Sequence, residues 1–206
     1  MPDIQPFTVR PALPEDGPRI AELVVEGFVD KFRPVFGDRR ELSVGIMEKW
    51  VELEHSAGGV RSLVIESDGE VVASVGVRLE ESDEDLVARG LWKTLRRALG
   101  TLRTLWATTL LSYPSYSARS SEAYVERLVV APGHRNRGMA RSLLHSAEEL
   151  ARQTGKETVG LHVSGNNEAA MKLYEDESYT EASRQRSLLT GYFLGVRNWL
   201  YMKKKL

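Results

Sequence analysis

LVVAPGHRNRGMA, residues 128–140, is the stretch that decides the fold. Its apolar start is typical of a strand end, and the Pro-Gly pair that follows indicates a turn. A cationic loop then leads into an amphipathic helix, which the spacing of apolar residues predicts from about residue 137 to 153. The first turn of a helix has unpaired N–H groups and a partial positive charge, and the small residues Gly138 and Ala140 allow close approach. The stretch therefore predicts a phosphate-binding loop at a helix N-terminus.

The composition limits the class of protein. With 206 residues, of which 28% are charged and 42% hydrophobic, the chain is expected to form one domain, residues 1–206, with a buried core. The formal net charge of −1 gives no general attraction to nucleic acid or to an anionic membrane. The chain has no cysteine, which excludes disulfides, thiolate metal ligands and a cysteine nucleophile. The N-terminus has no signal-peptide core and no apolar run is long enough to span a bilayer, so a cytoplasmic protein without a metal is expected.

Alternation, periodicity and turn residues predict the other elements. The expected strands cover residues 7–10, 62–66, 70–79, 123–130, 158–163, 181–188 and 196–202. The expected helices cover the segment after Pro18 as far as Phe28, then residues 41–54, 137–153 and 168–175.

Residues 91–111 predict one continuous amphipathic helix of about five to six turns. Its apolar residues recur at steps of three and four, from Leu91 through Trp106 to Leu110. The helix lies in a helical insertion expected at about residues 81–120. Its tryptophans and leucine stripe need burial, either by ordinary packing, as a lid over a binding site, or in a homodimer. A membrane-surface helix is the less favoured interpretation.

Two motifs at matching spacing make the chain resemble the GNAT superfamily of acyl-CoA N-acyltransferases. The first is a strand ending in Val-x-Pro followed by Arg-x-x-Gly-x-Ala, at Val130–Pro132 and Arg135–Ala140. The second is an Asn, an Ala three residues on and a Tyr four beyond that, at Asn167, Ala170 and Tyr174. Two motifs in the proper order are more specific than one.

The resemblance is strong over residues 124–179 and loose over residues 7–79. It implies an α/β fold, with a GNAT-like mixed, largely antiparallel central sheet, splayed parallel strands and flanking helices. It also implies acetyl-CoA as co-substrate. The motif strand would bond the pantetheine amides, the loop and helix start would bind the pyrophosphate, and the second motif would contact the coenzyme arm. The residues implied are Leu128, Val129, Val130, Arg135, Asn136, Arg137, Gly138, Met139, Ala140, Arg141, Asn167, Ala170 and Tyr174.

The activity implied is transfer of an acetyl group to a primary amine of a small molecule or peptide. The amine must lose a proton, and in several family members a carboxylate at the position of Glu126 accepts it, often through water. Period-two alternation puts Glu126 on the same strand face as Leu128. His162 is a second candidate base, and Tyr174 matches the position that often protonates the leaving thiolate. A backbone N–H near Val129 would polarise the thioester carbonyl.

The sequence leaves alternatives open. A non-catalytic acyl-CoA-binding sensor or interaction module is the second function. Glu126 has a structural alternative, which is pairing with Arg127 or Arg78. Ser178 stands where the family usually has a glycine after the helix of Tyr174, and serine is less comfortable there if φ is positive. Six aromatic residues are candidate walls of the acceptor site: Phe28, Phe32, Tyr113, Tyr116, Tyr192 and Phe193.

Overall fold

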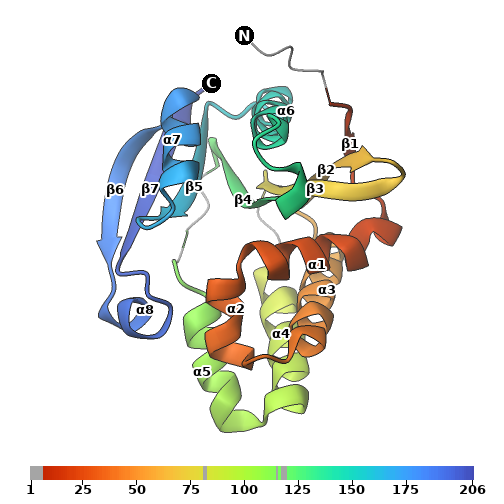
Figure 1. Ribbon diagram of the computed structural model, residues 1–206, viewed down its shortest axis with the longest axis vertical. Helices are drawn as coiled ribbons and strands as arrows, with labels where there is room; N and C mark the ends of the chain where they lie inside the picture. The colour runs from red at the N-terminus through yellow and green to blue at the C-terminus, as the bar shows by residue number, and fades with distance from the viewer. Residues whose placement is uncertain (1–6, 81–82, 115, 117–119) are drawn as a thin grey trace.

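A seven-stranded mixed sheet forms the centre of the computed structural model, which describes residues 7–80, 83–114, 116 and 120–206. The strand order is β1-β2-β3-β4-β5-β7-β6, and only β4 and β5 run parallel (Figure 1). The strands are β1 (Val9–Pro11), β2 (Val60–Ser67), β3 (Glu70–Arg78), β4 (Glu122–Val130), β5 (Thr158–Ser164), β6 (Thr180–Arg186) and β7 (Asn198–Lys205). The sheet is therefore the mixed, largely antiparallel one that the sequence predicts.

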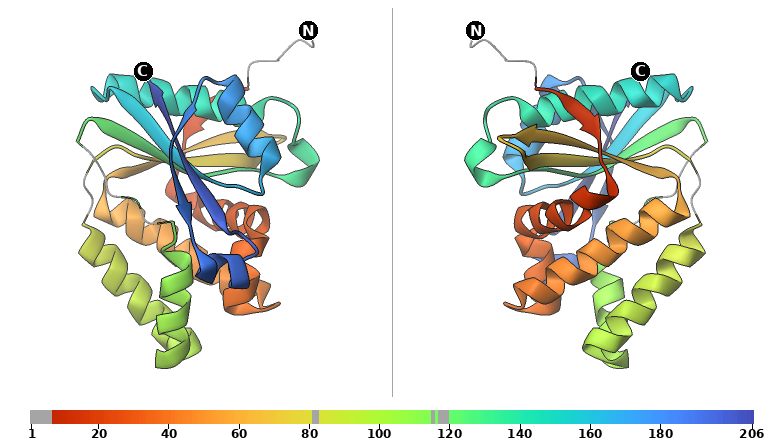
Figure 2. Two further views of the ribbon diagram at one scale, coloured as in Figure 1. Left: turned by 90° about the vertical axis from the view of Figure 1, so that its left-hand side faces the viewer. Right: turned by 90° about the vertical axis from the view of Figure 1, so that its right-hand side faces the viewer.

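Helices cover both faces of the sheet. Two lie on one face, α6 (Met139–Gln153) and α7 (Glu168–Asp176), whereas the N-terminal helices and the α4–α5 pair lie on the other (Figure 2). This second group comprises α1 (Gly17–Gly27), α2 (Val29–Phe36), α3 (Arg40–Ala57), α4 (Glu84–Leu99) and α5 (Thr101–Leu111). A short helix, α8 (Leu188–Phe193), joins β6 to β7, and two 3₁₀ turns cover Pro14–Asp16 and Pro132–His134. No described helix is both long enough and apolar enough to cross a membrane.

The core lies between the sheet and these two helical layers. The inner face of α6 is buried as its periodicity predicts, with Leu143, Leu144 and Ala147 completely covered. Strand β3 is buried along almost its whole length, from Val71 to Val77, because helices cover it on both faces. Such a strand is a continuous apolar run, and its position next to β4 gives the motif strand a rigid support.

The predicted continuous helix over residues 91–111 is wrong. The chain forms two helices that meet at Gly100, whose φ of 77° lies in the left-handed region. The apolar spacing continues across the break, so periodicity alone did not show it. The result is a helix pair in which Leu95 and Leu110 are buried, while Leu102 remains 84% exposed just after the turn.

Three further differences concern element ends. The helix expected to run to Phe28 ends at Gly27, and a separate helix α2 follows it. The strand expected to reach Leu188 ends at Arg186, because the Ser187 hydroxyl accepts a hydrogen bond from the Thr190 amide (3.2 Å) and begins α8. The last strand covers residues 198–205 in place of 196–202.

Candidate active site at the splay of two parallel strands

The parallel strands β4 and β5 separate after a short paired segment. Their register covers four residue pairs, from Glu122↔Thr158 to Val125↔Leu161. Beyond this point β4 continues to Val130 and β5 to Ser164 without pairing to each other. Backbone groups on the facing edges of a splay have no ladder partner and are available to a ligand that resembles a peptide strand. The expected splay is therefore present beside Leu128, Val129 and Val130.

A β-bulge interrupts β4 at this splay. The register with β3 changes from Gly76↔Glu126 to Ser74↔Val129, and Arg127 has a φ of 53°. The extra residue breaks the alternation of side chains, so alternation no longer places Glu126 and Leu128 on one face. A bulge also turns backbone N–H groups out of the ladder, which is common next to active sites.

Glu126 and Arg127 belong to a cluster of buried charges. Arg127 Nη1 donates a hydrogen bond to Glu54 Oε1 (2.9 Å), and its Nη2 lies 2.6 Å from Glu54 Oε2. Arg78 Nη2 and Arg127 Nη1 each lie 3.2 Å from an oxygen of Glu126. The Trp50 indole N–H donates to the same Glu54 carboxylate (2.8 Å). The structural pairing that the sequence offered as an alternative is thus present.

Burial nevertheless raises the pKa of the Glu126 carboxyl above its ordinary value. Desolvation is the largest cause, and the nearby Glu54 carboxylate adds to it. The positive charges of Arg127 and Arg78 act in the opposite direction and partly offset this rise in the pKa. A carboxylate in this state is a stronger base than one in water, which suits proton transfer.

The loop between β4 and α6 has open backbone amides. Gly138 adopts the left-handed conformation (φ 87°) and serves as the N-cap of α6, and Asn136 has a φ of 61°. Within the described chain, no acceptor is found for the amides of residues 136–141. The Met139 side chain is buried in the core, so only its amide can contribute. Open amides at a helix N-terminus are what the predicted phosphate-binding loop requires, and the binding itself stays a prediction.

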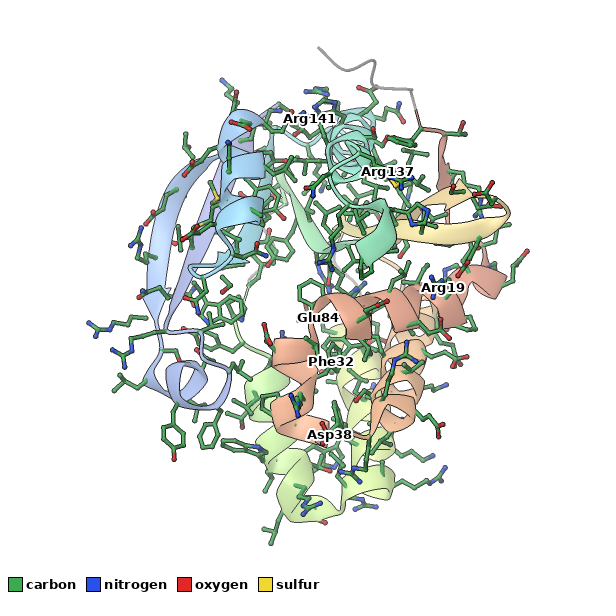
Figure 3. All side chains as sticks on the ribbon, viewed as in Figure 1. Arg19, Phe32, Asp38, Glu84, Arg137 and Arg141 are labelled. Carbon is green, nitrogen blue, oxygen red and sulfur yellow. The ribbon has the colours of Figure 1, made fainter. Side chains whose placement is uncertain are left out.

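The arginines of this loop differ in their contacts. Arg137 is exposed and has no ion pair or side-chain hydrogen bond with any described residue (Figure 3). Arg135 Nε donates to the Val130 carbonyl (3.2 Å). Arg141 binds the Glu177 carboxylate, at the end of α7. Two cations therefore remain available beside the open amides, whereas the third is engaged elsewhere.

Asn167 and Ala170 begin α7. The Asn167 side-chain oxygen accepts a hydrogen bond from the Ala170 amide (3.1 Å), which makes Asn167 the N-cap. This contact explains the spacing of the two residues without a ligand. It leaves the Asn167 side-chain amide as the group that could reach a coenzyme.

Tyr174 lies at the C-terminal part of α7 and is 8% exposed. Burial raises the pKa of its hydroxyl to about 12. The tyrosine is thus fully protonated at neutral pH, as a proton donor must be. Ser178 has a φ of 67°, so it holds the left-handed position that the family usually gives to glycine.

His162 lies on β5, where its Nδ1 is 2.9 Å from the Tyr124 hydroxyl. Burial lowers the pKa of the imidazole to about 4, and Nε2 is a buried atom without a hydrogen-bond partner among the described residues. The ring is therefore neutral at pH 7 but only weakly basic. No direct hydrogen bond joins Glu126, His162 and Tyr174 to one another in the described chain.

Sequence reasoning missed several residues around this site. Glu54 and Tyr124 are the partners of Arg127 and His162, and Lys31 donates to the Tyr113 carbonyl (3.1 Å). Their contacts join positions 38 to 82 residues apart, so no local pattern could reveal them. Of the predicted aromatic walls, Phe32 is a core residue, 5% exposed and stacked near Phe36.

A separate groove of about 470 Å³ lies between α3 and α4. Its lining residues belong to these two helices and include none of the predicted site residues. The part of the chain that the structure describes also contains no group of three or more His, Asp or Glu side chains arranged to hold a metal ion.

Sequence comparison identifies a family and relatives that match part of the chain. The model of the acetyltransferase (GNAT) family matches residues 22–177. The chloroplastic GCN5-related N-acetyltransferase 4 of Arabidopsis thaliana is 38% identical over 66 residues, which are 32% of this chain and 23% of that protein. Streptothricin acetyltransferase of Streptomyces lavendulae is 32% identical over 88 residues, 43% of this chain and 47% of the relative. The matched segments thus span less than half of either relative.

Solved structures share the fold over nearly the whole chain. A crystal structure of an acetyltransferase has a TM-score of 0.68 at 22% identity and covers 96% of this chain and 98% of its own. Ribosomal-protein-alanine N-acetyltransferase of Brucella melitensis has a TM-score of 0.64 at 17% identity, with coverage of 97% and 100%. An acetyltransferase of Salmonella typhimurium, solved with acetyl-CoA, has a TM-score of 0.60 at 15% identity, with coverage of 98% and 95%.

Proposed function

The chain belongs to the GNAT family of acetyltransferases, and on this premise we propose that it transfers an acetyl group from acetyl-CoA to a primary amine of a small molecule or a peptide. One observation carries the proposal: the open amides of residues 136–141 lie at the end of the same strand that leaves β5 at the splay. A diphosphate and an amide-bearing arm therefore find complementary groups along one continuous path.

The residues present fit acetyl-CoA. The amides at the start of α6, with Arg135 and Arg137, would hold the pyrophosphate, and the backbone of Leu128–Val130 would hold the pantetheine arm. The Arg135 contact with the Val130 carbonyl is a solvent-exposed hydrogen bond, which a ligand can replace at small cost. When bound, acetyl-CoA supplies the acetyl group as an activated thioester.

Glu126 is the better-supported base. An attacking amine must be neutral, and the raised pKa of the Glu126 carboxyl makes it the stronger proton acceptor of the two candidates. Because the carboxylate is held between Arg78 and Arg127, a water molecule would relay the proton. His162 stays neutral but weakly basic, since its pKa is about 4. Its role is to hold the Tyr124 hydroxyl in place.

Tyr174 supplies the proton that the leaving thiolate needs. Its hydroxyl is protonated at neutral pH and has no hydrogen-bond acceptor among the described residues, so the proton is not committed elsewhere. The developing oxyanion needs a backbone N–H that the sheet does not use. The bulge at Arg127 supports this assignment for an amide near Val129, because the ladder with β3 is interrupted between Glu126 and Val129 and resumes at the Ser74↔Val129 pair.

The experiment that tests the proposal is calorimetric titration with acetyl-CoA. We expect the double variant Arg135→Glu/Gly138→Asp to bind roughly 100-fold more weakly than the wild type, since it puts negative charge and side-chain bulk where an anion must bind. The matched control is Arg152→Glu/Gly155→Asp at the other end of α6, where Gly155 also has a positive φ (73°). Equal losses of acetyl-CoA affinity in both variants would contradict the proposed phosphate-binding loop. Binding without turnover on a broad amine panel would favour a non-catalytic module.

The expected homodimer remains a proposal, and exposed leucines on α5 support it. Leu102 and Leu105 on α5 are 84% and 52% exposed, so the leucine stripe is only partly covered within one chain. Light scattering coupled to gel filtration would measure the mass of the particle. A monomer at micromolar concentration would rule the dimer out.

A further inference from the structure

Lys31 is a half-buried cation without a close anionic partner among the described residues. It lies on α2, and its ammonium group donates one hydrogen bond, to the Tyr113 carbonyl (3.1 Å). No carboxylate of the described residues lies within ion-pair distance of it. Partly buried charges are normally paired, because water no longer solvates them fully. An ammonium also has three N–H donors, of which this contact uses one.

The cations around it are already engaged. Arg127 binds Glu54 and Glu126, and Arg78 lies close to the same two carboxylates. With Lys31 the group contains three cations and two carboxylates, an excess of one positive charge. Desolvation is the main reason that the Lys31 pKa falls to about 8, with the attraction of Glu126 and the repulsion of Arg127 as smaller and opposing influences. An added anion is what would relieve this imbalance.

Lys31 lies on the side of the sheet that α1 and α2 cover (Figure 2), close enough to β4 to be influenced by the charges of Glu126 and Arg127. The end of α1 touches β4 so closely that a Cβ on Gly27 would lie 2.9 Å from Cγ1 of Val129. Lys31 follows one turn later in the sequence, on α2, which lies below β4 in Figure 1 and carries the neighbouring residue Phe32 that Figure 3 labels. Its partner Tyr113 has its ring near that of Trp199 on β7, with centroids 6.0 Å apart. Lys31 thus lies between the motif strand and the far half of the sheet.

We propose that Lys31 binds a carboxylate of the acceptor, so that the preferred substrates are amines that carry a carboxylate close to the amine, as amino acids do. The inference rests on the proposed acetyl transfer. The two N–H donors of Lys31 that bond no described residue would bond the carboxylate oxygens, and the added negative charge would balance the three cations. The nearby Glu126 would then face the amine of the same molecule.

Matched pairs of acceptors test this assignment. The standard L-amino acids are compared with their amides, which keep the side chain and the amine but lose the negative charge. Polyamines and simple alkylamines complete the panel. We expect kcat/KM at saturating acetyl-CoA to favour the acid over its amide by roughly tenfold or more, as for a charge-assisted hydrogen bond. Lys31→Gln should remove most of this preference, mainly through KM.

Two further variants serve as controls. Lys31→Arg keeps the cation and should keep the preference for acids within a few fold. Lys49→Gln removes a lysine from the surface of α3, where it pairs with Glu52, and should leave the acid-to-amide ratio unchanged. Circular dichroism and thermal melting verify that all variants are folded.

The outcomes separate the two proposals. Turnover restricted to amines without a carboxylate, or an acid-to-amide ratio unaffected by Lys31→Gln, would overturn the assignment while leaving acetyl transfer intact. Tight acetyl-CoA binding with no turnover of any amino acid would overturn it too. Absence of acetyl-CoA binding would instead remove the proposed function itself.

Discussion

The proposed phosphate-binding loop and the buried charge cluster are two halves of the proposed site, but they are built in opposite ways. The loop is a continuous segment, residues 132–141, and its binding groups are backbone amides. The cluster joins side chains from α3, β3 and β4, namely Glu54, Arg78, Glu126 and Arg127. The first therefore depends on local conformation, and the second depends on how distant elements pack.

This difference decides what a substitution does. A backbone amide cannot be removed by changing a side chain, so the loop is sensitive chiefly to bulk, charge and φ at its glycine. Neutralising one partner of a buried ion pair destabilises the folded state, because the other charge remains buried without a partner and poorly solvated. Variants in the loop should alter ligand affinity, whereas variants in the cluster should alter folding.

The largest effect is expected for Glu54→Gln, which leaves the buried Arg127 without its main partner. We expect the free energy of unfolding to fall by about 3–5 kcal/mol. Urea denaturation followed by circular dichroism measures it. The control is Glu52→Gln on the same helix, which breaks an exposed pair with Lys49 and should cost less than about 0.5 kcal/mol. Similar losses in the two variants would show that the cluster contributes no more than a surface pair.

The Tyr174→Phe substitution tests the chemical step separately from the loop and from the charge cluster. Removing the hydroxyl should lower kcat by about 100-fold or more and leave the affinity for acetyl-CoA nearly unchanged. Steady-state kinetics with calorimetry measures the two quantities. Tyr179→Phe is the control, since its hydroxyl donates to the buried Glu148 (3.0 Å), so its loss should lower stability and spare kcat. An unchanged rate and pH profile in Tyr174→Phe would remove the acid role.

His162 should make stability depend on pH. Burial lowers its pKa from 6.5 to about 4, so the unfolded chain binds the proton more readily than the folded one. The contribution to stability is complete above pH 6.5 and is lost as the pH falls toward 4. Urea denaturation at pH 7 and pH 5 should show a smaller decline for His162→Gln than for the wild type. Parallel declines would mean that the imidazole is solvated in the folded state.

The smallest effect concerns the end of α7. Ser178→Gly removes a side chain from a left-handed residue and should raise the free energy of unfolding by about 0.5–1 kcal/mol. Thermal melting detects such a gain. Ser187→Gly is the control, because Ser187 has a φ of −127° and caps α8, so glycine should destabilise slightly there. A gain in stability in both variants would point to a general effect of glycine, unrelated to the positive φ at Ser178.

Local chemistry explains which features could be predicted. The loop and the α6 face each follow from residues within a few positions of one another. The break at Gly100 was missed because the apolar stripe stays in phase on both sides of it. The Arg127 bulge could not be predicted from the sequence, because alternation assumes an uninterrupted strand. Lys31 and Tyr113 are brought together by packing alone.

The short seam between β4 and β5 gives a bound molecule a mechanical role. Only four residue pairs of the described strands join the leaf β1-β2-β3-β4 to the leaf β5-β7-β6. A molecule that bonds to the free edge of β4 and packs against β5 lengthens this seam, and its binding energy adds to the cohesion of the two leaves. Acetyl-CoA would then stabilise the contact between the two leaves of the sheet as well as act as a reactant. Each release of coenzyme would weaken this contact, and binding of the next molecule would restore it.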